Sequence, residues 1–237
     1  VSTVSEVERF STLLDSVCSK LLEEGVEVRR PPVGVMAEVP AVIPLLPHMR
    51  GMIDFISIGS NDLSQYLLAV DRDNPRVSRL FDHLHLSVLD TIQRIAEHGR
   101  ALGVPVSVCG EMAADPYAAI LLLGMGIESL SMSAYSIPRI KWLVRTIPFK
   151  DAKSLYEKAS NNPDPDSVRM QIHKFLIEQG LARVLEPSAE SGERRTLQET
   201  TASSTPIFLS AADTGIEGLS MVPQSMACGS PLFCSPS

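Results

Sequence analysis

The stretch IDFISIGSNDLSQYLLAVDR, residues 53–72, passes from an apolar run through a polar turn into a helical pattern. Its first part, residues 53–58, has the length and composition of a buried strand. The turn that follows consists of Gly59, Ser60, Asn61 and Asp62. A buried strand that leads through such a turn into a helix is typical of a βα unit in a parallel sheet.

Similar units are predicted on both sides of this stretch. Other short apolar runs predict buried strands at residues 33–37, 104–108 and 129–132. Helical patterns follow at least three of the four runs. One covers residues 87–103, one has Asp115 as N-cap and Pro116 at its first position, and one starts at Ser136. The alternation predicts an α/β fold with parallel strands.

The two ends of the chain differ from this central part. Ser5 and Glu8 form a capping-box pattern ahead of an apolar stripe, which predicts an N-terminal helix. Residues 150–159 and 167–179 predict two C-terminal helices. Residues 187–237 are rich in Ser, Thr, Pro and Gly with little periodicity, so we predict a disordered tail there.

Composition excludes several classes of protein. The chain has 237 residues and a net charge of −7, which disfavours binding to nucleic acid or to an anionic membrane. No apolar stretch reaches the roughly 18 residues of a membrane span, so we expect a cytoplasmic location.

The four cysteines show no zinc or disulfide pattern, and the five histidines are expected on the surface or in loops. A start at Val1 instead of Met suggests a fragment.

Polar residues end the predicted strands. Glu38 follows the first run, Asn61 and Asp62 follow the second, and Cys109 ends the third. The carboxyl ends of parallel strands share one edge, so we expect these side chains on one surface. Glu38 and Asp62 suit Mg²⁺, which takes one or two protein carboxylates with substrate oxygens and water. Alternatively, Glu38 caps the next turn and Asp62 caps the next helix.

The same edge has groups that suit a phosphate. The turn at residues 59–62 offers backbone N–H groups at a helix start, and Arg72 has a bidentate fork for an anion. A solvated side chain is the commoner role for a single arginine. The Cys109 thiol could transfer a proton, or it could be buried and inert. From the residues alone, these alternatives stay open.

Several ordered blocks carry a family resemblance. They are GVMAEVP (34–40), SIGSNDLSQY (57–66) with AVDR (69–72), CGEMA (109–113) and LLGMG (122–126). Together they resemble the TIM barrel of enzyme I, the phosphoenolpyruvate–protein phosphotransferase of bacterial phosphotransferase systems, over about residues 1–147. Residues 168–185 look more like its nitrogen-related paralogue, which carries an N-terminal GAF domain.

The resemblance implies a role for each candidate residue. Glu38 and Asp62 match the Mg²⁺ ligands, and Asn61 with the Asp62 backbone matches the group that contacts the substrate phosphate. Arg72 matches a phosphate-binding arginine. Cys109 matches the general acid that protonates the enolate carbon as pyruvate leaves. Ala114 departs from the family, which usually has a glycine after this GEMA run.

The resemblance also implies an architecture and partners. Residues 1–147 would be the C-terminal half of a (β/α)₈ TIM barrel, followed by a C-terminal helical extension over residues 148–186. The tail at residues 187–237, predicted from composition, resembles no part of the family. The phosphorylatable histidine and the early strands would precede Val1, so this fragment alone is expected to be inactive. The implied partners are phosphoenolpyruvate (PEP), Mg²⁺, an HPr-like phosphocarrier protein and a second copy in a homodimer.

Two other functions stay open. A pyruvate phosphate dikinase or PEP synthase barrel shares the Glu, Asn-Asp and Cys-Gly-Glu pattern, and an upstream ATP-grasp domain would favour it. The chain could also be a non-catalytic dimerisation or regulatory fragment, because the barrel of this family is also its dimer interface.

Overall fold

Parallel strands lie side by side in the order in which they occur along the chain. The computed structural model describes residues 1–185 and 207–210. Within these residues the sheet order is β1 (Gly34–Ala37), β2 (Phe55–Gly59), β3 (Val106–Cys109), β4 (Ser129–Met132) and β5 (Ile207–Ser210). The first four strands pair in parallel, and β5 pairs antiparallel with β4. The predicted α/β fold and its four predicted strands are confirmed.

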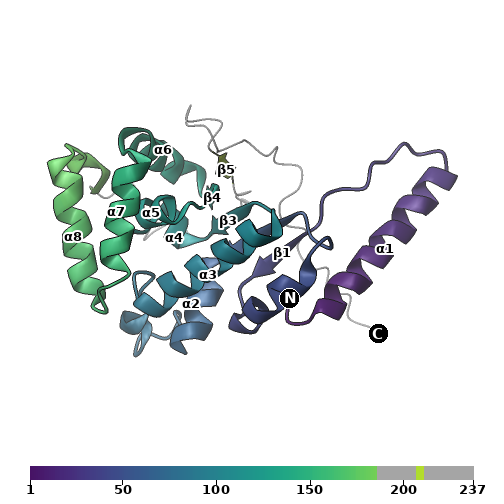
Figure 1. Ribbon diagram of the computed structural model, residues 1–237, viewed down its shortest axis with the longest axis horizontal. Helices are drawn as coiled ribbons and strands as arrows, with labels where there is room; N and C mark the ends of the chain where they lie inside the picture. The colour runs from purple at the N-terminus through teal and green to yellow at the C-terminus, as the bar shows by residue number, and fades with distance from the viewer. Residues whose placement is uncertain (186–206, 211–237) are drawn as a thin grey trace, which may run out of the picture.

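Helices connect and flank the strands (Figure 1). In chain order, the described helices, with η for 3-10 helices, are α1 (Val4–Glu23), η1 (Pro40–Met49), α2 (Ser60–Leu68), η2 (Ser78–Leu80), α3 (Leu86–Leu102), α4 (Glu111–Ala114), α5 (Pro116–Met125), η3 (Ala134–Ser136), α6 (Ile137–Thr146), α7 (Phe149–Ala159), α8 (Pro165–Glu178) and η4 (Ala182–Leu185). From β1 to β4, each strand lies next to the strand that precedes it in the chain, and the sheet grows in one direction. Right-handed crossovers in such an order collect the helices on one face of the sheet.

The two faces of the sheet differ in burial. One face is packed, and its side chains from β1 to β3 are Val35, Ala37, Ile56, Ile58, Val106 and Val108. The residues that alternate with them are only partly buried and include Met36, Ser57, Ser107 and Cys109. Parallel sheets are normally covered on both faces. Here the second face is less completely covered than the first over β1 to β3, whereas Ser131 of β4, which pairs with Cys109, is 1% exposed.

Helix α5 packs against the C-terminal helices α7 and α8. Residues 118–125 are all buried, and Asp115 caps the helix by accepting from the Tyr117 amide at 3.2 Å, as predicted. A methyl group at Gly124 would lie 2.4 Å from the Ala152 carbonyl oxygen of α7. Glycine therefore allows the close approach of α5 and α7. The two C-terminal helices predicted from the sequence are confirmed as α7 and α8.

Helix α1 extends away from the rest of the fold, at the opposite end from α7 and α8 (Figure 1). The predicted Ser5–Glu8 capping box is wrong: the helix starts at Val4, and Glu6 instead accepts from the amide and hydroxyl of Ser2, both at 3.0 Å. Most of the predicted apolar stripe is not covered within the described residues. Its exposed members include Phe10 (54%), Leu13 (63%), Val17 (45%) and Leu22 (57%).

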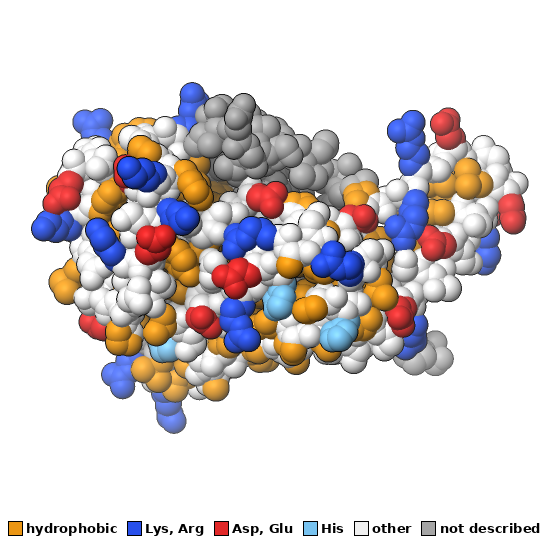
Figure 2. Space-filling view, in the orientation of Figure 1, with side chains coloured by type: hydrophobic (Ala, Val, Ile, Leu, Met, Phe, Trp, Pro, Cys, Tyr) orange, Lys and Arg blue, Asp and Glu red, His pale blue; other side chains and the backbone are white. Residues whose placement is uncertain are grey.

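The remaining predictions concern the surface and the tail. The predicted disordered tail is not confirmed at residues 207–210, which form strand β5; the rest of residues 187–237 lies outside the described residues. No helix in the described part of the chain is long and apolar enough to span a membrane. Acidic and basic side chains are intermixed on the face shown in Figure 2.

Candidate active site

Polar residues meet at the carboxyl edge of the parallel strands. Glu38 directly follows β1 and, from the register of β1 on β2, lies level with Gly59, which pairs with Cys109. Asn61 and Asp62 are in the first turn of α2, which begins directly after β2. The structure thus brings four of the five candidate residues to one edge of the sheet. The fifth, an arginine, is in the loop after α2.

The two carboxylates at this edge suit a hard cation. A methyl group at Gly59 would lie 3.1 Å from Cβ and 3.3 Å from Oε2 of Glu38, so glycine makes room for this carboxylate at the start of α2. Asp62 is half-buried in the first turn of the same helix. Among the described residues, no three Asp, Glu, His or Cys side chains form a metal-binding group. A cation bound by two carboxylates must take further oxygens from water or substrate, and this donor set fits Mg²⁺.

The loops after β2 and β3 are bonded to each other. The Ser60 hydroxyl donates to the Cys109 carbonyl at 2.7 Å, and Asn61 Oδ1 accepts from the Glu111 amide at 3.2 Å. Because Oδ1 is engaged, the Nδ2 group of Asn61 remains as a donor for an anion. This contact of Ser60 was not predictable from the sequence. A serine at a helix start is common, and nothing local to it indicates a bond to another loop.

Gly110 is required for this contact between the loops. Its φ is +111°, and a methyl group there would lie 2.6 Å from Ser60 Oγ and 3.0 Å from Asn61 Oδ1. We expect Gly110→Ala to lower the free energy of unfolding by about 2–4 kcal/mol, through backbone strain and overpacking together. Chemical denaturation of the chain measures this loss.

Gly51→Ala is the matched control for this substitution. Gly51 also has a positive φ, +74°, but nothing lies within 4 Å of the added methyl group. We expect a loss of about 1–2 kcal/mol, from the left-handed backbone alone. Equal losses for the two variants would contradict the role of Gly110 in fitting the two loops together.

The Cys109 thiol lies on the less completely covered face of the sheet, and Cys109 is half-buried. Its Sγ is 3.4 Å from the Ile58 carbonyl oxygen, 3.8 Å from Ser57 Oγ and 3.9 Å from Met36 Sδ. Cys109 and Cys18, the two cysteines described by the structure, form no disulfide. The thiol therefore points across β2 toward β1, away from the core beneath the helices, where a small ligand at the edge could reach it.

Arg72 begins the long loop between α2 and α3. Its side chain is half-buried, and it takes part in none of the ion pairs formed within residues 1–185. The guanidinium is therefore not neutralised by a described carboxylate. Such a group is suited to an anionic ligand.

His83 lies near the end of the same loop. It is a loop residue, as predicted, but its ring is mostly buried: Nδ1 is 3.1 Å from Ser64 Oγ, and Nε2 is buried without a partner in the described part. Burial lowers the pKa of His83, against the opposing influence of Glu111 and Asp82. The folded state therefore disfavours the protonated ring, and the contribution of His83 to stability falls as the pH drops below about 6.5.

These features describe an α/β domain with carboxylate, amide and thiol side chains along one edge of its sheet, and the family comparison shows which class of domain it is. The family described as PEP-utilising enzyme, PEP-binding domain matches residues 1–149. This is more than half of the chain. The chain belongs to this family.

Curated relatives agree with the family. The chain is 37% identical over 186 residues to a Salmonella typhimurium protein named "Phosphoenolpyruvate-dependent phosphotransferase system", covering 78% of the chain and 25% of the relative. It is 40% identical over 182 residues to the "Phosphoenolpyruvate-protein phosphotransferase" of Haemophilus influenzae, covering 76% and 32%. A protein of the same name from Cupriavidus necator is 45% identical over 139 residues, covering 58% and 24%.

The alignments cover only part of each relative and extend beyond the family match in this chain. The chain spans about a quarter to a third of the length of these relatives. The two longer alignments exceed the 149 residues that match the family, so the similarity continues into the C-terminal helices.

Proposed function

We propose that this chain is part of a PEP–protein phosphotransferase and forms one half of its PEP-binding site. The observation that carries the proposal is the meeting of Glu38, Asn61, Asp62 and Cys109 at one edge of the sheet in a member of a PEP-binding family. The names of the relatives support the same reaction.

We infer that residues 1–147 are the C-terminal half of a (β/α)₈ barrel. The sequential strand order with parallel pairing supports this, since four βα units are half of eight. The incomplete cover of the second face over β1 to β3 supports it too, because the interior of a complete barrel is packed by its other strands. The uncovered apolar side chains of α1 are a further surface for the missing half.

The edge residues have complementary roles in this reaction. Glu38 and Asp62 would hold Mg²⁺, which supplies charge neutralisation at the phosphate of PEP when bound. Asn61 Nδ2 and the backbone N–H groups at the start of α2 donate to the phosphate oxygens, and Arg72 neutralises its charge.

The remaining step is the departure of pyruvate. As the phosphoryl group leaves, the electrons of the broken O–P bond stay on the enolate oxygen, and the enolate carbon then takes a proton. The Cys109 thiol gives that proton and becomes a thiolate. The phosphoryl group passes to a histidine on another domain and from there to an HPr-like phosphocarrier protein. Positioning and charge neutralisation supply most of the catalysis in such transfers.

A labelled-phosphate experiment tests this function. PEP with a radioactive phosphoryl group is given, with Mg²⁺, to the whole protein that carries this chain and to the 237-residue chain alone. We expect the whole protein to label itself and a phosphocarrier, and the chain alone to do neither. Transfer to a nucleotide would instead support the dikinase or PEP synthase alternative. A whole protein without transfer would support the non-catalytic alternative, and pyruvate release by the chain alone would contradict the half-site proposal.

A further inference from the structure

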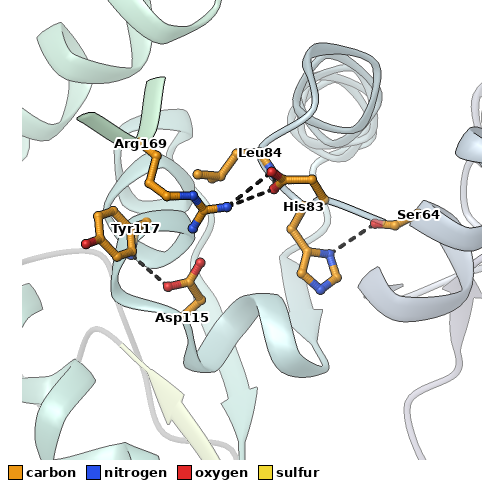
Figure 3. Close-up of polar contacts among 7 residues, drawn as sticks. Ser64, His83, Leu84, Asp115, Tyr117 and Arg169 are labelled. Carbon is orange, nitrogen blue, oxygen red and sulfur yellow. Dashed lines mark hydrogen bonds and ion pairs between the residues drawn. The ribbon is translucent and has the colours of Figure 1, made fainter. Parts of the chain in front are cut away.

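Helix α8 is bonded to the long loop that begins with Arg72. Arg169 Nη2 of α8 donates to both carboxylate oxygens of Asp82, at 3.1 and 3.2 Å. The Arg169 side chain is 40% exposed and that of Asp82 26%, so the pair is partly shielded from water. Figure 3 shows the Arg169 guanidinium reaching from its helix to the segment that contains His83 and Leu84.

The end of the loop is also fixed from its other side. Asp82 Oδ1 accepts from the Leu84 amide at 2.8 Å, which holds the carboxylate in one orientation. The ring of His83 faces α2 and bonds the fully buried Ser64 at 3.1 Å (Figure 3). Ser64 is in the same helix as Asp62. The end of the loop is therefore hydrogen-bonded to α8 on one side and to α2, the helix that starts at the candidate site, on the other.

Arg169 itself is held in place by α5. Its guanidinium carbon lies 5.4 Å from the centre of the Tyr117 ring, a cation–π contact. The Tyr117 hydroxyl bonds His173 Nδ1 at 2.9 Å, which joins α5 to α8 a second time. Burial raises the pKa of nearby Asp115, while the hydrogen bond from the Tyr117 amide and then the charge of Arg169 lower it. The arginine thus has a fixed position before it meets the loop.

We propose that Arg169 is a positioning residue for the PEP site. By holding Asp82, it restrains the loop over residues 71–85 and thereby sets the place of Arg72 relative to Asn61 and Asp62. The effect of Arg169 on PEP binding rests on the proposed function, whereas its restraint of the loop does not depend on that function. The C-terminal helices would then have a part in substrate binding although they lie outside the sheet edge.

The test uses Arg169→Gln, Asp82→Asn and the double variant in the protein that carries this chain. Lys174→Gln is the matched control, because Lys174 is on the same helix, is 79% exposed and has only a long contact of 3.9 Å with Glu178. Amide hydrogen exchange over residues 71–85 is the first readout. We expect both single variants to raise exchange about tenfold, the double variant to add little more, and the control to change nothing.

PEP kinetics are the second readout. We expect the KM for PEP to rise about tenfold in Arg169→Gln, with a smaller change in kcat, and Arg169→Lys to recover part of the loss. Unchanged exchange in both single variants would overturn the restraint. Faster exchange with an unchanged KM would overturn its link to Arg72. If the unaltered protein does not use PEP, the proposed function fails, while exchange still decides whether the restraint exists.

Discussion

Replacing Cys109 by alanine is expected to slow pyruvate release from PEP about 10²- to 10⁴-fold in the protein that carries this chain. The enolate carbon needs a proton, and alanine has none to give. Among the described residues, the Met36 thioether, the Ser57 hydroxyl and the Ile58 carbonyl contact Sγ, at 3.4 to 3.9 Å. None of them is an acid of comparable strength. We expect binding of PEP to persist, because the groups proposed to contact its phosphate are unchanged.

Cys18→Ala is the control for this prediction. Cys18 is in α1, and its thiol is the other one that the structure describes. Initial rates of pyruvate release and a PEP binding titration are measured on both variants and on the unaltered protein. A Cys109→Ala protein that turns over PEP within about twofold of the original rate would remove the general-acid assignment. An equal loss in Cys18→Ala would point to a general effect on the fold.

The strands could be predicted because each is a short apolar run that is followed by polar residues. β4 has the predicted bounds, while β2 and β3 start two residues later than predicted. The starts differ for local reasons. Asp54 turns its carboxylate to the Val33 amide at 2.7 Å, and Pro105 has no N–H to give to a sheet. The hydrophobic pattern locates a strand, and hydrogen bonding decides where it begins.

The candidate site was predictable to the same extent as the sheet that carries it. Parallel strands with ends at one edge place Glu38, Asp62 and Cys109 together whatever the details of packing. The bond between Arg169 and Asp82 was not predictable, because it joins residues 87 positions apart and depends on how α8 packs. The burial of His83 has the same origin. Contacts that depend on helix packing leave no local signal in one sequence.

Replacing either carboxylate at the edge is expected to have the second large effect. Glu38→Gln and Asp62→Asn keep the size of each side chain but remove a charge that a divalent cation requires. We expect each variant to weaken Mg²⁺-dependent binding of PEP by at least about 10²-fold. This effect is larger than the one expected when a residue that only hydrogen-bonds to a metal ligand is replaced. The Glu38 side chain packs closely against Gly59, so a change in its shape would also disturb this contact. Because the amide of glutamine has the shape of the carboxylate, Glu38→Gln tests the loss of charge alone.

Glu111→Gln is the matched control, since Glu111 lies at the same edge with an exposed carboxylate to which no metal role is assigned. Its backbone amide, which bonds Asn61 Oδ1, is unchanged by the substitution. Titration calorimetry with PEP, in the presence and absence of Mg²⁺, measures all three variants. Because the control removes the same charge from the same edge, weak binding in all three would mean that overall charge matters and not coordination. Normal binding by Glu38→Gln and Asp62→Asn would exclude both residues as ligands. Loss in these two alone would show that Mg²⁺ links β1 to α2 across the edge of the sheet.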